Sequence, residues 1–268
     1  MMTGFKLLWL VALGCGIVLR APPAQAQSQF SLNLTNPTPA AYDYFGNSVA
    51  TVGSDRVLIG APFDDTGAGN AGAAYLFSTN GTLLATFPNP TPAANDYFGN
   101  AVAGVGNDRV LIGAYRADTG ATDAGVAHLF RTNGALLTTF TNPTPAANDY
   151  FGYAVAAVGS DRVLIAAYGD DTGALNAGAA YLFNTNGTLL TTFTNPTPAA
   201  EDNLGDELAA VGGDRGNEGS DWDDTGADNA GAAYLFSTNG TLLTAFTNPT
   251  PATDDYFGAV VAAVGGDR

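Results

Sequence analysis

Apolar residues in this chain come in short runs separated by turn residues. From residue 46 onward, runs of five to seven apolar or small residues alternate with stretches rich in Gly, Asn, Asp, Thr and Pro. Short runs with such boundaries are typical of β-strands, whereas an amphipathic helix needs apolar residues at three- and four-residue intervals over a longer stretch. The pattern therefore predicts an all-β fold.

The pattern also repeats along the chain. The tetrapeptide Asn-Pro-Thr-Pro recurs with a constant spacing of 53 residues, starting at Asn36, Asn89, Asn142, Asn195 and Asn248. Strand-rich repeats of about 40–50 residues are typical of β-propellers. We therefore divide this part of the chain into four complete repeats and the start of a fifth, at 36–88, 89–141, 142–194, 195–247 and 248–268.

The first repeat contains four strand candidates, at 46–52, 57–61, 73–77 and 82–87. Asn80-Gly81, between the last two, is a strong hairpin signal because both residue types tolerate positive φ. The Pro-containing stretch that follows is long enough to reach the innermost strand of the next repeat. The expected fold class is thus an all-β propeller of four-stranded antiparallel blades, with the first strand of each blade innermost.

Two short motifs carry a resemblance to a known family. Phe45-Gly46 opens the first strand, and Gly60-Ala61-Pro62 closes the second. In these motifs the chain resembles the FG-GAP repeat, the blade unit of the integrin α-subunit propeller and of many exported bacterial proteins. The resemblance spans 29–268, although the fourth repeat has Leu204 in place of the phenylalanine. It implies a seven-bladed ring used for adhesion or ligand recognition, without catalysis of its own.

The number of blades differs from that of a closed ring. The sequence shows about four blades and a partial one, since the fifth repeat stops at Arg268, before its second strand. Residues 27–35 align with the register of a last strand, so we expect them to complete a terminal blade. We therefore expect the sequence to be incomplete at its C-terminal end and to form an open array of blades.

Residues 1–26 have the pattern of a signal peptide. Lys6 precedes an apolar run at 7–19, and Ala24-Gln25-Ala26 supplies small residues for cleavage. The run is short for a ~30 Å hydrocarbon core, so a membrane anchor fits less well, as does a lipoprotein signal at Cys15. We expect export, a secreted or cell-surface location, and no membrane insertion of the mature chain. Its only cysteine leaves with the signal peptide, which excludes disulfides.

Charge narrows the range of partners. Of the 9 basic residues, Lys6 and Arg20 lie in the predicted signal peptide, which leaves 7 against 25 acidic residues and a formal net charge of −18. Such a charge argues against nucleic acid and anionic membranes as partners, and leaves cations, proteins and neutral glycans.

Aspartates concentrate in the connections that antiparallel winding places at one end of every blade. These connections run from the second to the third strand and from the last strand to the next blade; the latter carry Asp43, Asp96 and Asp149. We predict a ligand-binding surface at this end of the blades. Its candidate residues are Asp64, Asp65, Asp118, Asp123, Asp170, Asp171, Asp223, Asp224 and Asp228.

These aspartate-rich loops have two interpretations. The sequence Asp-Asp-Thr-Gly-Ala could surround a calcium ion, a hard cation that needs several oxygen ligands. Alternatively, Asp and Asn side chains form turns while Gly supplies positive φ. The loop lacks alternating carboxylates and a bidentate Glu, and 52–55, the connection that carries calcium in the integrin-like family, is too short. We therefore predict no metal and no cofactor, with calcium as the open alternative.

The fourth repeat is degenerate. Its second strand reads Arg-Gly-Asn-Glu in place of Arg-Val-Leu-Ile, and Glu201, Glu207 and Glu218 all fall in this repeat beside Trp222. Acids near an aromatic residue suit a carbohydrate-active enzyme, with Glu218 and Asp221 as its acidic groups. The simpler interpretation is local decay, in which polar residues enter a buried strand.

The single histidine and the arginines of the tight turns can be explained without a ligand. The single histidine, His128, stands where other repeats have Tyr75, Tyr181 and Tyr234, and we interpret it as a tolerated substitution on an outward strand face. The arginines that follow Asp in each tight turn, such as Arg56, are expected to order that turn.

The leading functional prediction is an exported, non-enzymatic FG-GAP propeller that binds a protein or glycan, or mediates adhesion, through its Asp-rich loops. Near-identical repeats suit multivalent contact, whereas a catalytic site needs unlike residues in one place. The alternatives are a carbohydrate-active enzyme with its acids in the fourth repeat and a purely structural array.

Overall fold

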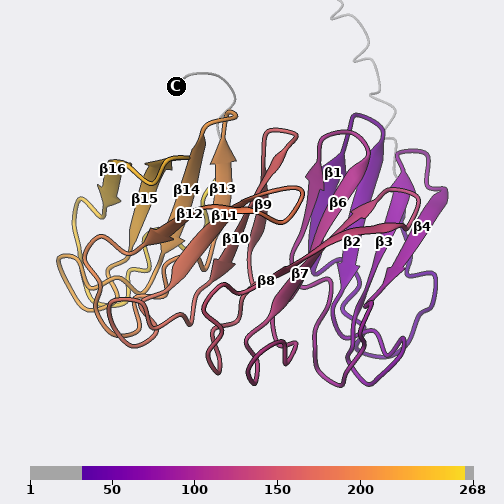
Figure 1. Ribbon diagram of the computed structural model, residues 1–268, viewed down its shortest axis with the longest axis horizontal. Helices are drawn as coiled ribbons and strands as arrows, with labels where there is room; N and C mark the ends of the chain where they lie inside the picture. The colour runs from indigo at the N-terminus through magenta and orange to yellow at the C-terminus, as the bar shows by residue number, and fades with distance from the viewer. Residues whose placement is uncertain (1–31, 263–268) are drawn as a thin grey trace, which may run out of the picture. The chain divides into compact units, whose positions relative to one another are not determined.

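The computed structural model describes residues 32–262, and within them it contains four antiparallel sheets of four strands and no helix (Figure 1). In the first repeat the strands are β1 (Ser48–Val52), β2 (Arg56–Ala61), β3 (Ala73–Ser78) and β4 (Leu83–Pro88). The second sheet contains β5 (Val102–Val105), β6 (Arg109–Ala114), β7 (Val126–Arg131) and β8 (Leu136–Thr141). The third contains β9 (Val155–Val158), β10 (Arg162–Ala167), β11 (Ala179–Asn184) and β12 (Leu189–Thr194). The fourth contains β13 (Leu208–Val211), β14 (Arg215–Ser220), β15 (Ala232–Ser237) and β16 (Leu242–Thr247). The predicted all-β class and four-stranded antiparallel blades are confirmed.

The four sheets follow one another in chain order, with their first strands adjacent. β5 contacts β1 on one side and β9 on the other, and β13 contacts β9. A pocket of about 500 Å³ is lined by residues from all four first-strand regions, among them Ser48, Ala101, Ala154 and Glu207. The first strand of each blade is therefore innermost, as predicted. Within 32–262, β13 and β1 do not pack against each other as consecutive first strands do, so these sheets do not form a closed ring, and the seven-bladed ring stays a prediction.

Each pair of neighbouring sheets encloses a layer of aromatic side chains. A phenylalanine of the last strand meets one on the third strand of the next sheet, with 5.3–5.4 Å between ring centroids, in the pairs Phe87–Phe130, Phe140–Phe183 and Phe193–Phe236. Burying a side chain of this size stabilises the fold by about 1.5–3 kcal/mol. Phe246, the equivalent residue of β16, is 44% exposed, because no sheet follows it in the described part of the chain.

The hairpin between the third and fourth strands forms where Asn80-Gly81 predicts it, but the two residues have different roles. Gly81 has a positive φ of 93°, whereas Asn80 is not in the left-handed region. The Asn80 side-chain oxygen instead accepts hydrogen bonds from the backbone N–H and the hydroxyl of Thr82, at 3.2 and 2.9 Å. The asparagine thus closes the turn with its side chain and leaves the unusual φ to glycine.

Neighbouring sheets approach most closely at the glycines of the two recurring motifs. The Gly99 N–H donates to the Gly113 carbonyl of its own sheet at 2.9 Å. The Gly99 carbonyl oxygen lies against Gly60 of the preceding sheet, where an added Cβ would come within 2.0 Å of it. Gly113 meets the Gly152 carbonyl at the same 2.0 Å. The Phe-Gly and Gly-Ala motifs are therefore two sides of one backbone contact between blades.

Several predicted segments lie wholly or partly outside the described residues. The predicted signal peptide at 1–26 does so entirely. The predicted terminal strand at 27–35 does so up to residue 31, and residues 32–35 are not in a strand. The start of the fifth repeat, 248–262, contains no strand, and 263–268 lie outside the description. Between residues 32 and 262, no helix is long and apolar enough to cross a membrane.

The close backbone contact predicts that Gly60→Ala destabilises the protein. The new methyl group would overlap the Gly99 carbonyl, and relieving such overpacking costs about 1–3 kcal/mol. Gly69→Ala is the matched control, because nothing lies within 4 Å of a Cβ built on Gly69. Urea denaturation followed by circular dichroism measures both variants; equal stability of the two would contradict the role given to Gly60.

Candidate functional site

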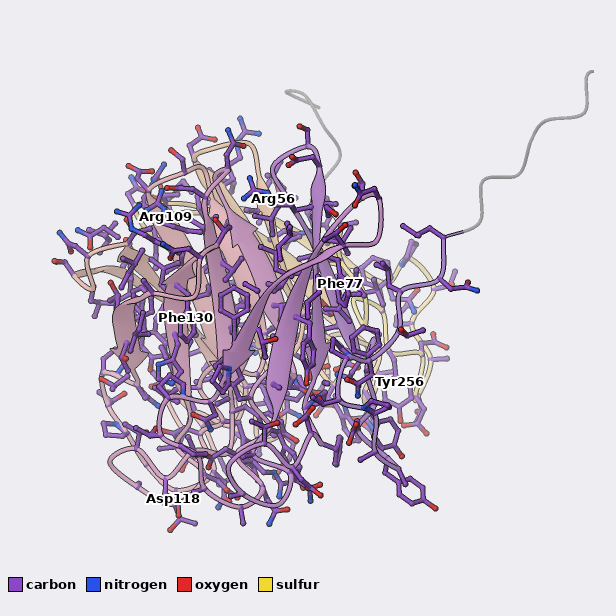
Figure 2. All side chains as sticks on the ribbon, turned by 90° about the vertical axis from the view of Figure 1, so that its right-hand side faces the viewer. Arg56, Phe77, Arg109, Asp118, Phe130 and Tyr256 are labelled. Atoms are coloured by element: carbon purple, nitrogen blue, oxygen red, sulfur yellow. The ribbon has the colours of Figure 1, made fainter. Side chains whose placement is uncertain are left out.

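The long connections gather at one end of the sheets. We call this end the long-loop surface; it consists of the β2–β3, β6–β7, β10–β11 and β14–β15 loops and the connectors that lead from each sheet to the next. Figure 2 shows Asp118, from the β6–β7 loop, at the opposite end of the sheets from Arg56 and Arg109. The predicted sorting of loops into two ends is therefore confirmed.

The aspartates of the connectors serve the connectors themselves. Asp96 is buried, and its carboxylate accepts hydrogen bonds from the Asn89 side chain at 2.7 Å and from the Ala93 N–H at 2.8 Å. Asp43, Asp149 and Asp202 are buried in the same arrangement. These residues close the Asn-Pro-Thr-Pro turn.

Three of the nine predicted ligand-binding aspartates are also buried. Asp64, Asp170 and Asp223 each accept a hydrogen bond of 2.6 Å from a tyrosine hydroxyl of the following strand, Tyr75, Tyr181 or Tyr234. The other carboxylate oxygen accepts from the backbone N–H two residues later, at 2.8–2.9 Å. These three residues hold their loops from inside, so they are not on the accessible surface.

The remaining predicted residues lie at the surface of their loops. Asp65, Asp118, Asp171 and Asp224 are exposed, and each accepts a hydrogen bond from the N–H five residues later at 2.8–2.9 Å. Asp123 and Asp228 lie further along the same loops. This is the side-chain turn interpretation of the Asp-rich sequence. Among residues 32–262 no three His, Cys, Asp or Glu side chains are grouped closely enough to hold a metal ion.

The second repeat replaces the buried Asp–Tyr pair with another pair. Ala117 stands in the place of Asp64, and His128 in the place of Tyr75. The prediction that His128 lies on an outward face is wrong, because it is buried, with Nδ1 3.1 Å from the Thr139 hydroxyl and Nε2 without a partner. Burial lowers the pKa of His128 to about 4, so the ring is neutral at pH 7. The Ala117 carbonyl accepts the Thr119 N–H at 2.8 Å and so replaces the lost carboxylate.

A row of aromatic rings crosses the long-loop surface. Consecutive ring centroids lie 4.8–5.8 Å apart in the order Tyr44, Phe63, Tyr97, Tyr115, Tyr150 and Tyr168. The Arg116 guanidinium lies 5.6 Å from the ring centroids of Tyr97, Tyr115 and Tyr150, within the range of cation–π contacts. At the interfaces of the first three repeats, the surface near the innermost strands is thus filled by side chains.

The row is interrupted between the third and fourth repeats. Gly169 stands where the earlier repeats have Phe63 and Arg116, and Asn203 stands where they have tyrosine. The row resumes only at Trp222, whose ring lies 5.6 Å from that of Tyr256. A pocket of about 800 Å³ opens at the interruption, lined by Tyr150, Tyr168, Leu175, Asn176, Glu201 and Trp222 among others. Of the predicted ligand-binding residues, only Asp171 lines it.

The unusual acids of the fourth repeat do not form one site. Glu218 is fully buried where other repeats have isoleucine, and neither carboxylate oxygen has a hydrogen-bond partner. Burial raises the pKa of Glu218 well above its usual value, because the site desolvates the charged form. Burial also raises the pKa of Asp206 to about 6, beside Asp221 and Glu207. β14 nevertheless pairs along its whole length, because strand pairing uses the backbone. The predicted burial of polar residues in this strand is confirmed.

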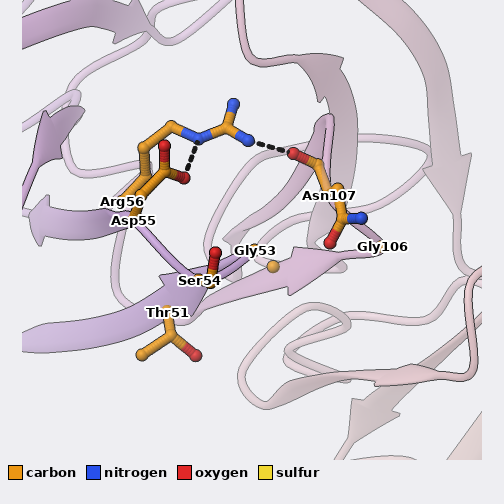
Figure 3. A pocket seen from close by; sticks show the side chains of 8 residues that line it. Thr51, Gly53, Ser54, Asp55, Arg56, Gly106 and Asn107 are labelled. Carbon is orange, nitrogen blue, oxygen red and sulfur yellow. Dashed lines mark hydrogen bonds and ion pairs between the residues drawn. The ribbon is translucent and has the colours of Figure 1, made fainter.

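The tight turns at the opposite end join neighbouring blades. Arg56 Nε lies 3.2 Å from Asp55, and its guanidinium also donates to the backbone carbonyl of Asn107 in the next sheet (Figure 3). Arg109 and Arg162 make the same contact with the carbonyls of Ser160 and Gly213. The arginines order their turns as predicted and, in addition, connect each blade to the next.

Four-stranded antiparallel sheets whose first strands share an axis define a β-propeller-type repeat protein. The sequence comparison specifies the family: the model described as the FG-GAP repeat matches residues 32–77, 91–130 and 138–183. The chain therefore contains FG-GAP repeats at these three positions. No curated protein matches it significantly in sequence.

Three solved structures are similar to this chain. U3-55K is 12% identical with a TM-score of 0.54, and the match covers 81% of this chain and 56% of that one. A protein of unknown function from Bacteroides caccae is 10% identical with a TM-score of 0.48, covering 75% and 60%. The C-terminal WD40 domain of Sif2 is 15% identical with a TM-score of 0.46, covering 74% and 47%. The chain thus spans less than two thirds of each, and the likeness to U3-55K shows the fold alone.

The replacement in the second repeat predicts energetic coupling between the two positions. Asp170→Ala removes the acceptor of the buried Tyr181 hydroxyl and is expected to cost about 2–3 kcal/mol. Asp170→Ala combined with Tyr181→His copies the second repeat, so it should cost less than the sum of the single variants by about 1 kcal/mol or more. Urea unfolding of the four proteins measures the coupling, and strictly additive effects would contradict the pairing.

The buried acids predict an unusual pH dependence of stability. Burial raises the pKa of Asp149, Asp202 and Asp206 to about 6, and it also raises the pKa of Glu218 above its usual value. The folded state therefore binds more protons than the unfolded state between about pH 4 and 6, and the free energy of unfolding falls as the pH rises through this range. The lowered pKa of His128 acts in the opposite direction, but it involves a single group.

Glu218→Ile, which restores the residue of the other repeats, isolates the contribution of this one acid. It removes a buried carboxyl without partners and is expected to stabilise the protein by about 2 kcal/mol at pH 7, and to flatten the decline above pH 5. Glu201→Gln, at an exposed position, should change stability by less than about 0.5 kcal/mol. Unfolding curves between pH 4 and 8 measure both; an unchanged slope in Glu218→Ile would contradict the assignment.

Proposed function

We propose that this chain is an exported, non-enzymatic binding protein that holds its ligand at the long-loop surface, in the pocket between the third and fourth repeats. The observation that carries the proposal is the interruption of the aromatic row at Gly169 and Asn203. Elsewhere on this surface the equivalent space is filled by Phe63 or by Arg116. A repeat array with a purely structural role has no need for one open interface that exposes Trp222, whose side chain is 43% accessible.

The net charge and the burial of Glu218 support a binding role and limit the range of possible ligands. The formal net charge of −16 disfavours nucleic acid and leaves a protein or a glycan as the ligand. The enzyme alternative required Glu218 as an acidic group in contact with substrate, and a fully buried side chain does not reach one. Export rests on the signal-peptide pattern of residues 1–26, which would place the protein outside the cell or at its surface.

The proposal predicts saturable binding that depends on the pocket. The radiolabelled chain is applied to immobilised neutral polysaccharides, anionic polysaccharides and extracellular proteins, with unlabelled chain as competitor. At least one surface should bind the chain saturably, and Trp222→Ala should weaken that binding about tenfold or more. Tyr42→Asn is the control, because Tyr42 is 81% exposed, does not line the pocket, and becomes the residue of the next two repeats. The proposal is wrong if no surface binds, or if Tyr42→Asn weakens binding as much as Trp222→Ala.

A further inference from the structure

We infer that the pocket between the third and fourth repeats binds a neutral oligosaccharide, with a sugar ring stacked on Trp222. The inference rests on the proposed function and specifies its ligand. It depends on three features of the pocket: the small residues at this interface, the groups that line the pocket, and the charges of those groups.

Two substitutions distinguish this interface from those of the earlier repeats. The residue before the Asp-rich loop is Phe63 in the first repeat and Arg116 in the second, and both side chains pack within the aromatic row. Gly169 has no side chain at this position, and the Asn148 carbonyl oxygen lies 2.1 Å from where a Cβ would be. Asn203 replaces the tyrosine of the preceding connectors, at a φ of 54° that matches 55° for Tyr97 and 58° for Tyr150. The backbone of Asn203 therefore has the same φ as that of the equivalent tyrosines. The smaller side chain of Asn203 leaves the pocket open.

The walls combine flat aromatic faces with amide and carboxylate groups. Tyr150, Tyr168 and Trp222 supply the aromatic walls, and Asn148, Asn176 and Asn203 supply amides. Aromatic rings offer an apolar face with little conformational freedom to lose, which suits the C–H face of a pyranose ring. Amides donate and accept hydrogen bonds side by side, as the neighbouring hydroxyls of a sugar do. A volume of about 800 Å³ lies within the usual range of ligand pockets.

A carboxylate in the pocket is already positioned by the fold. Both oxygens of Glu201 accept from the Asn176 amide at 3.1 Å, and the Asn176 backbone N–H donates to Asp171 at 2.8 Å. This arrangement holds Glu201 in place across the two repeats while lone pairs remain for ligand hydroxyls. The group that binds the ligand is thus oriented before the ligand arrives, which reduces the entropy lost on binding.

The charges of the pocket select against anionic sugars. Asp171 and Glu201 line it, and no Lys or Arg does. Sulfated, sialylated and uronic-acid sugars would meet repulsion with no compensating cation, whereas neutral sugars would not. An amine ligand is the electrostatic alternative, and the test includes it.

The sequence offers a direct optical probe of the pocket. The chain has two tryptophans, Trp9 and Trp222. In the full chain carrying Trp9→Phe, tryptophan fluorescence reports on Trp222 alone. Neutral hexaoses of β-1,4-glucan, β-1,4-mannan, β-1,4-xylan and α-1,4-glucan are titrated, together with a hexauronate and a diamine. At least one neutral hexaose should change the fluorescence saturably, and the hexauronate and the diamine should not.

Two variants and one control establish the site. Asn203→Tyr restores the tyrosine of the other repeats, so it should fold normally and weaken binding about tenfold or more by filling the pocket. Glu201→Ala, at an exposed position, should also weaken binding, and Tyr42→Asn should not. Saturable binding of a neutral hexaose that survives both Asn203→Tyr and Glu201→Ala would overturn the site.

The outcomes separate this inference from the proposed function. Saturable, pocket-dependent binding to an extracellular protein, to an anionic polysaccharide or of the diamine, without any response to the neutral hexaoses, would overturn the carbohydrate inference and leave the binding function standing. Absence of binding to every surface and every soluble probe would overturn both.

Discussion

The contact of one blade's backbone with the next, at glycines that lack a side chain, determines the spacing of the sheets. At Gly60 and Gly113 the carbonyl of the following Phe-Gly motif occupies the place of a Cβ. This contact brings neighbouring sheets close enough for phenylalanines such as Phe87 and Phe130 to meet, and for Arg56 to reach a carbonyl of the next turn. The glycines of the family motif are thus required because neighbouring backbones approach too closely for a side chain.

The spacing is less strict between the third and fourth repeats. Ala166 replaces the glycine there, and Leu204 replaces the phenylalanine of the following motif. At the same interface Glu218 enters the apolar layer, and the aromatic row on the long-loop surface is interrupted. The substitutions that depart from the regular packing and the pocket thus occur at the same interface.

Much of the fold follows from the sequence, because a constant period, short apolar runs and Asn-Gly turns are local signals. The sorting of loops to one end follows from antiparallel winding alone. The roles of individual aspartates could not be predicted from the sequence, because adjacent residues such as Asp64 and Asp65 look equivalent there. In the structure, only Asp64 accepts a hydrogen bond from the Tyr75 hydroxyl. The pocket could not be predicted for a related reason: Gly169 and Asn203 carry no reactive group, and they differ from the earlier repeats only in lacking larger side chains. The burial of His128 did not follow from its own position, because it goes with the replacement of Asp64 by Ala117 eleven residues earlier.

The exchange of Asp–Tyr for Ala–His in the second repeat has a consequence for how such arrays evolve. The two positions are eleven residues apart and belong to one loop and the strand after it. Recombination between repeats that breaks in the connectors or in the outer hairpins moves both residues together, so a newly copied unit carries a matched pair. Only breakpoints inside the intervening loop would create the mismatched combinations. Duplication can therefore spread or erase this variation among units without passing through an intermediate that folds poorly.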